Sequence, residues 1–173
     1  DFASEILSLR GNVNASRSYQ VGPNVTIGDA VRYSASPFLA RTFVWGVNAT
    51  LRPFSRIQST LDVTASRLTD PRNGGSEIVD VKLFRLRTDM QFTERLGLRN
   101  IAAFNTRDET LDLKVLLNYR VNAGTVFYVG YDDHYQQGDL IQGDRDGDGI
   151  DDQLFQSDAL RRTNRAVFIK LQY

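Results

Sequence analysis

The 173-residue sequence contains no cysteine and a single histidine, His134. Without cysteine the chain cannot form a disulfide framework, a Cys-ligated metal site or a thiol nucleophile. With no second histidine and no Gly-x-Ser-x-Gly motif, the common hydrolytic constellations cannot be assembled from it. We therefore do not expect an enzyme.

Net charge and long apolar runs are also lacking. The 21 basic residues balance the 21 acidic ones, so the chain lacks the excess of basic residues that is typical of nucleic-acid-binding proteins. No run approaches the roughly 20 consecutive apolar residues of a transmembrane helix. A membrane-barrel strand needs only about 9–11 residues with every second one apolar, so this composition is compatible with a membrane barrel.

What the sequence does contain is two-residue alternation. Between Phe43 and Leu51, apolar residues occupy the odd positions and mostly polar residues lie between them. No apolar set recurs at the three- and four-residue spacing of an amphipathic helix. The alternating segments are 6–19, 25–36, 42–52, 56–66, 78–92, 96–106, 111–120, 126–135 and about 161–173. The pattern predicts an all-β fold of antiparallel strands in one domain, residues 1–173.

Two irregularities carry specific predictions. Gly22-Pro23-Asn24 predicts a turn between the first two segments. Between residues 78 and 92 the apolar positions change from odd to even numbers. A β-bulge near Lys82-Leu83 would reconcile the two halves of that segment.

The last segment ends the chain on an aromatic ring. One face of this segment carries Val167, Ile169, Leu171 and Tyr173. The arrangement resembles the carboxy-terminal signal strand of bacterial outer-membrane β-barrels, whose alternate apolar residues face lipid and whose terminal aromatic is read by the insertion machinery. The resemblance implies two partners for these four residues, the lipid bilayer and the barrel-insertion machinery.

Strand length and aromatic placement favour a membrane barrel over a soluble one. The segments run to roughly 11–15 residues, whereas strands of soluble proteins usually have about 5–6. The predicted periplasmic strand ends carry aromatic residues, as an interfacial girdle requires: Tyr19, Phe54, Phe92, Tyr119 and Tyr173. We predict an antiparallel transmembrane β-barrel of the bacterial outer membrane. The alternative is a soluble lipocalin-like or sandwich-type binding module.

Strand parity predicts more strands than this sequence supplies. If every connection is a hairpin and Tyr173 ends in the periplasm, nine strands place Asp1 at the outer surface. Single-chain bacterial barrels have an even strand number. We therefore expect the carboxy-terminal part of a larger barrel, next to upstream strands or envelope partner proteins. An eight-stranded complete barrel is the alternative if one of the first two segments is a loop. Residues 136–160 would form a long external loop.

Three stretches resemble one protein family. They are Phe92-Thr93-Glu94-Arg95-Leu96, the turn from Tyr119 to Thr125, and the closing 164–173. They are similar to the carboxy-terminal barrel domain of large envelope proteins that carry an amino-terminal, family-nine-like carbohydrate-binding module. The similarity covers roughly the last 130 residues, and Ala123 stands where the family has proline. It implies an outer-membrane pore, anchor or translocation channel, with a link to glycan uptake.

The most specific local motif is acidic and lies in the predicted external loop. Oxygen ligands at positions one, three, five, seven and nine of a calcium loop would come from Asp144, Asp146, Asp148, the Ile150 carbonyl and Asp152. Phe155 occupies the twelfth position, where an EF-hand needs a bidentate Glu, so a full EF-hand is excluded. The motif predicts a partial calcium site, and the alternative is a solvated acidic loop.

The polar sides of the strands carry the remaining candidate residues. The charged residues predicted to line the lumen are Arg52, Arg85, Arg87, Asp89, Asp112, Lys114 and Arg120. We expect them mainly to pair with each other rather than to select solutes. We expect His134 to be a polar residue at the outer rim of the barrel, near the end of its strand. A membrane-barrel hydrolase that uses Asp132 and Asp133 as an acidic pair is the third functional hypothesis.

Overall fold

The computed structural model describes residues 4–33, 37–138, 140–141, 155–156 and 159–173. Its strands are β1 (Ile6–Arg10), β2 (Val13–Ser16), β3 (Tyr19–Arg32), β4 (Phe38–Phe54), β5 (Ile57–Asp70), β6 (Ser76–Gln91), β7 (Leu96–Asn105), β8 (Thr110–Arg120), β9 (Val126–Gln136), β10 (Leu140–Ile141), β11 (Phe155–Gln156) and β12 (Arg161–Gln172). A short 3₁₀ helix, η1 (Pro71–Asn73), joins β5 to β6. The predicted all-β fold is confirmed. Among the described residues, no helix is long and apolar enough to cross a membrane.

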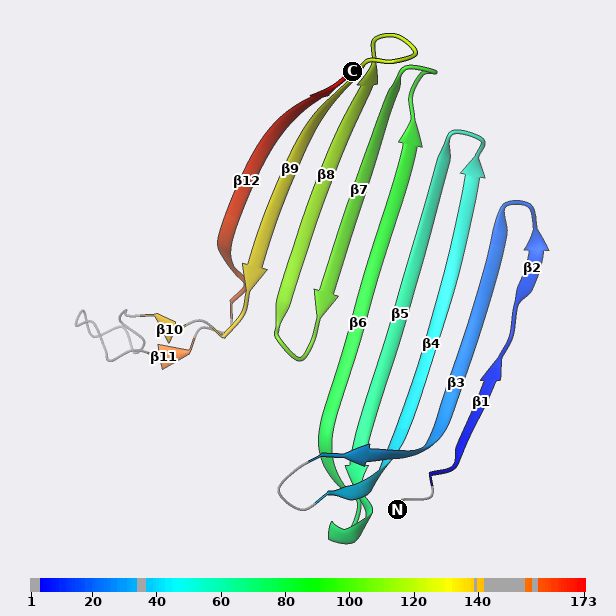
Figure 1. Cartoon of the computed structure of the whole chain (residues 1–173), viewed down its shortest axis with the longest axis vertical. Coiled ribbons are helices and arrows are strands. Elements are labelled where there is room, and N and C mark those ends of the chain that lie inside the picture. The colour runs from blue at the N-terminus through cyan, green and yellow to red at the C-terminus, as the bar shows by residue number, and fades with distance from the viewer. Residues whose placement is uncertain (1–3, 34–36, 139, 142–154, 157–158) are drawn as a thin grey trace.

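All the long strands belong to one antiparallel sheet (Figure 1). Its order is β1-β3-β4-β5-β6-β7-β8-β9-β12, and β2 pairs with β3 beside β1. From β2 to β9, each strand pairs with the next one along the chain, whereas β1 and β2 both pair with β3. Strands β10 and β11 form a separate two-stranded sheet. Within the described part of the chain, β1 and β12 are free edges. The sheet is open there and does not close into a barrel.

The two ends of the sheet are built differently. At one end, here called the turn end, lie the four short connections 17–18, 55–56, 92–95 and 121–125, together with Tyr173 (Figure 1). Side chains order these turns: Thr93 Oγ1 accepts a hydrogen bond from the Leu96 N–H at 3.0 Å, and Asn122 Oδ1 accepts one from the Thr125 N–H at 2.9 Å. At the opposite end, the loop end, β3 and β9 end, β4 and β12 begin, and the connections 71–75 and 106–109 lie.

The turn predicted at Gly22-Pro23-Asn24 is wrong, because β3 runs straight through these residues. The Pro23 carbonyl accepts a hydrogen bond from the Gly11 N–H at 2.9 Å, in the gap between β1 and β2. An N–H at Pro23 would point toward the same gap. Because the neighbouring strand is interrupted there, the missing proline N–H breaks no ladder bond.

The bulge predicted near Lys82-Leu83 is also wrong. The β5–β6 pairing runs without a shift from Ile57↔Met90 to Leu68↔Val79, and the irregularity falls beyond Leu68. Strand β6 therefore keeps one alternation from Val79 to Met90. Its apolar residues Val79, Val81 and Leu83 consequently lie on the same side of the sheet as Arg85.

Of these apolar residues, Val79 and Val81 are half-buried, whereas Leu83 is exposed. The loop-end parts of β3 and β4 cross over those of β5 and β6 (Figure 1), and Phe38 and Ala40 of β4 are buried there. The Arg72 guanidinium lies 3.4 Å from the centroid of the Phe38 ring. Asp70 in turn holds Arg72, and the hydrogen bonds from the Arg72 side chain lower the pKa of the Asp70 carboxyl.

Candidate functional site

The sheet presents two chemically different faces, because residues paired across strands share a face. The apolar face includes Phe43, Trp45, Val47, Ala49, Leu61, Val63, Phe84, Leu86, Leu111, Leu113, Val115, Leu117, Val129, Val167, Ile169 and Leu171. The polar face includes Asn48, Arg52, Gln58, Asp62, Arg85, Arg87, Asp89, Arg99, Asp112, Lys114, Asn118, Arg120, Asp132 and His134. All the residues predicted to line a lumen thus lie on one face.

The apolar face is exposed in the isolated chain. Val167, Ile169 and Leu171 of β12 are 66%, 67% and 57% exposed. The only apolar residues buried among those described are Phe38, Ala40 and Ala65. The described chain therefore has almost no interior of its own, and its largest apolar surface faces outward.

Charged residues limit the apolar face at the loop end. Asp29 pairs in register with Arg41 there, and Arg67 forms an ion pair with Glu77 at 2.6 Å. At the turn end lie Tyr19, Phe54, Phe92, Tyr119 and Tyr173. On β4 the uncharged stretch from Phe43 to Leu51 rises roughly 27 Å along the strand. A strand tilt of about 40° would give a band roughly 20 Å tall, close to the apolar band of outer-membrane barrels.

Asp133 is a buried charged residue on the apolar face, which the sequence did not predict. Asp133, only 2% exposed, receives two hydrogen bonds from Arg165, at 2.9 and 3.1 Å. The hydroxyl groups of Tyr131 and Tyr135 donate to the same carboxylate at 2.5 and 3.0 Å. This cluster joins β9 to the terminal strand β12. The sequence signal was a charge at an apolar position in each strand.

Several charges of the polar face pair with each other. Asp89 accepts hydrogen bonds from Arg87 Nε at 2.8 Å and from Arg99 Nε at 2.6 Å, so one carboxylate serves two guanidinium groups. Lys114 Nζ lies 3.3 Å from Asp132. Arg52, by contrast, donates a hydrogen bond from Nε to a neutral side chain, the amide oxygen of Gln58, at 3.0 Å. Pairing therefore neutralises part of this face and leaves part of it cationic.

The acidic pair proposed for a hydrolase is not assembled. Asp132 lies on the polar face beside Lys114, whereas Asp133 lies on the apolar face beside Arg165. Adjacent residues of a strand point to opposite faces, so these carboxylates cannot act together. His134 Nδ1 lies 2.6 Å from Asp112 Oδ1 on the polar face, and no serine is hydrogen-bonded to that ring among the described residues.

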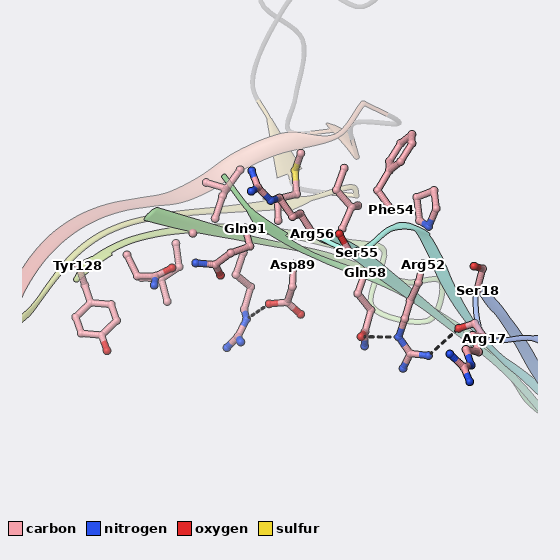
Figure 2. Close-up of a pocket in the computed structure, with 18 residues that line it drawn as sticks. Arg17, Ser18, Arg52, Phe54, Ser55, Arg56, Gln58, Asp89, Gln91 and Tyr128 are labelled. Atoms are coloured by element: carbon pink, nitrogen blue, oxygen red, sulfur yellow. Dashed lines mark hydrogen bonds and ion pairs between the residues drawn. The ribbon is translucent and has the colours of Figure 1, made fainter. Parts of the chain in front are cut away.

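A cavity of about 660 Å³ lies at the turn end. Figure 2 shows Arg52, Gln58, Asp89 and Tyr128 extending to the same side of the sheet, the polar one. The cavity is lined by Arg17, Arg52, Asp89, Arg99, Asn118 and Tyr128, among others. Arg52 also donates to the Arg17 carbonyl at 3.4 Å, which ties the β2–β3 turn to the cavity rim.

The predicted calcium ligands, Asp144, Asp146, Asp148, Ile150 and Asp152, lie outside the described residues. The small β10–β11 sheet flanks them, pairing Ile141 with Phe155. Among the described residues, no group of three or more His, Asp or Glu side chains is arranged to hold a metal ion. Calcium binding by the acidic loop stays a prediction.

The chain shows no match to known proteins at any of three levels. No family model matches its sequence, no curated protein matches it, and no solved structure matches it. The function is therefore inferred from the geometry and chemistry of the two faces of the sheet.

Proposed function

We propose that the chain forms part of a β-barrel in the bacterial outer membrane and works as a pore, anchor or translocation channel without enzymatic activity. One observation carries the proposal: an exposed apolar face extends from the edge strand β1 to the edge strand β12, and its charges are confined to its loop-end part and the Asp133–Arg165 cluster, while the other strand charges face the opposite side. A link to glycan uptake would follow only from the family resemblance of the sequence.

Water is a poor environment for such a face. Soluble monomers rarely expose contiguous apolar patches larger than a few hundred Å². A soluble sandwich would bury this face against a second sheet, but the described residues form a single layer apart from the β10–β11 sheet. Lipid acyl chains would cover the face without any further protein layer. The charged limit at the loop end and the aromatic limit at the turn end fit the two interfaces of a bilayer.

The free edges support closure by further strands. In a bilayer, unpaired backbone groups on β1 and β12 would each cost several kcal/mol, on the order estimated for buried unsatisfied groups. Strands β1 and β12 run in the same direction, since β1 is antiparallel to β3 and every later neighbour alternates. Direct pairing of the two edges would be parallel. An all-antiparallel barrel therefore requires an odd number of additional strands between them.

Extraction and gel mobility of the full-length protein test the proposal. We expect the protein to remain in the membrane fraction until detergent is added. We also expect it to migrate at different positions before and after boiling, because a closed barrel resists unfolding by cold detergent. The control is the boiled sample, which should run as a single unfolded species. Recovery as a detergent-free soluble monomer would contradict the proposal.

A further inference from the structure

The charges of the chain are distributed unevenly between the faces and the loops. The whole chain is neutral, but the polar face is not. Its basic residues are Arg10, Arg32, Arg52, Arg85, Arg87, Arg99, Lys114, Arg120, Arg161 and Lys170. Its acidic residues are Asp62, Asp70, Asp89, Asp112 and Asp132. Basic residues outnumber acidic ones about two to one on this face, and many compensating carboxylates, such as Glu94, Asp108 and Glu109, lie in turns.

The excess of basic over acidic residues is concentrated at the cavity of the turn end. Its single carboxylate, Asp89, already binds Arg87 and Arg99, and both of its oxygens are in use. Among the described residues, no carboxylate lies within ion-pair distance of Arg17 or Arg52. The cavity therefore holds more guanidinium charge than its own carboxylate can neutralise.

We propose that this cavity binds the oxyanion groups of an anionic solute, and that the polar face passes or holds anions in preference to cations. The proposal rests on the polar face being the lumen of the proposed barrel. A guanidinium group offers a planar fork of N–H donors that matches carboxylate, sulfate and phosphate oxygens. Low-dielectric walls around a concave charged surface focus its field and raise the local concentration of counter-ions.

Figure 2 shows the arrangement of the side chains that line the cavity. Arg52 and Arg17 lie next to each other at one side of the cavity, with Gln58 between Arg52 and the Asp89 ion pair. Two of the Arg52 nitrogen atoms use neutral acceptors, the Gln58 side chain and the Arg17 carbonyl. Neither contact cancels the positive charge of Arg52. An oxyanion bound there would gain two charge-assisted interactions.

Calorimetric titration of the detergent-solubilised full-length protein tests the binding directly. The probes are sodium tripolyphosphate and sodium citrate, which separate phosphate from carboxylate recognition. We expect binding that weakens as ionic strength rises. We also expect the double variant Arg17→Gln, Arg52→Gln to bind about tenfold more weakly or worse. The reason is that this variant loses both charge-assisted hydrogen bonds to the anion. The control variant Arg95→Gln, Arg107→Gln removes equal charge from two turns and should bind like the wild type.

A second measurement separates this inference from the proposed barrel. In planar bilayers with a potassium chloride gradient, the reversal potential of the inserted protein should show preference for chloride. A soluble full-length protein that still binds either probe through Arg17 and Arg52 would support the anion site while contradicting the barrel. An inserted barrel that prefers potassium, a wild type that binds neither probe, or equal affinity in the double variant would overturn the anion site.

Discussion

At the residue scale, Asp132 and Asp133 show how strongly strand geometry separates sequence neighbours. The former pairs with Lys114 on the polar face, and the latter pairs with Arg165 on the apolar face. The two-residue period alone predicts that they diverge. It cannot predict which partner each one meets, because Arg165 is 32 residues away and its register with β9 depends on the intervening loop.

Val115 tests the assignment of the apolar face. It lies in the middle of the apolar row of β8, so Val115→Arg should destabilise the protein in lipid by about 2–4 kcal/mol. The neighbouring change Lys114→Gln removes an exposed ion pair and should cost little, within about 1 kcal/mol. Urea unfolding in lipid vesicles measures both. The reverse order of costs would show that the two faces are exchanged.

Arg165 tests the charge cluster between β9 and β12. Arg165→Gln would leave the buried Asp133 carboxylate with the Tyr131 and Tyr135 hydroxyls alone. Losing one partner of a buried pair is more costly than losing an exposed pair. We therefore expect a larger loss of unfolding free energy than for Lys114→Gln, measured in the same assay. Arg162→Gln, at an exposed position of the same strand, is the control, and equal effects at both positions would contradict the cluster's role.

At the element scale, alternation located most strand boundaries to within a few residues. Strand β8 (Thr110–Arg120) covers the predicted 111–120, and β9 (Val126–Gln136) covers 126–135. The errors arose where tertiary context overrides local signals. Pro23 is tolerated because its neighbour is interrupted, and Val79 and Val81 lie half-buried on the polar face.

Gly130 and Phe168 test the packing of the terminal strand on β9. A Cβ atom at Gly130 would lie 2.1 Å from the Phe168 ring, so Gly130→Ala forces that ring to move. Because Phe168 is 49% exposed, its ring can turn away at the cost of a less favourable rotamer, and we expect a loss of about 0.5–1.5 kcal/mol in unfolding free energy. In a Phe168→Ala background the same glycine substitution should cost much less. A double-mutant cycle measures the difference, and equal costs in both backgrounds would rule out the ring–glycine contact.

The acidic loop has its own prediction, which comes from the sequence. Calcium should bind weakly, with a dissociation constant on the order of 10⁻⁴–10⁻³ M, because the twelfth-position Glu is replaced by Phe155. Calorimetric titration with calcium chloride should give heat with the wild type and none with the Asp146→Asn, Asp148→Asn double variant. Identical heats for the two proteins would identify the segment as a solvated acidic loop.

At the scale of the whole molecule, the sequence predicted an antiparallel sheet and its closure into a barrel with upstream strands; the structure shows the sheet, which is open among the described residues. Alternation identifies which residues share a face, and parity predicts that nine strands are too few for an antiparallel barrel. The structure agrees that β1 and β12 are parallel free edges among the described residues. The alternation of apolar and polar residues within this chain does not specify which strands pair with β1 and β12.

Cysteine scanning along β8 tests the central claim, that the apolar face meets lipid and the polar face meets water. The chain has no native cysteine, so single substitutions at residues 112 to 117 can be labelled in membranes with a charged thiol reagent. We predict fast labelling at the even positions, including Asp112 and Lys114, and protection at the odd positions, including Leu113 and Val115. Labelling at the odd positions with protection at the even ones, or uniform labelling at all six, would contradict the account.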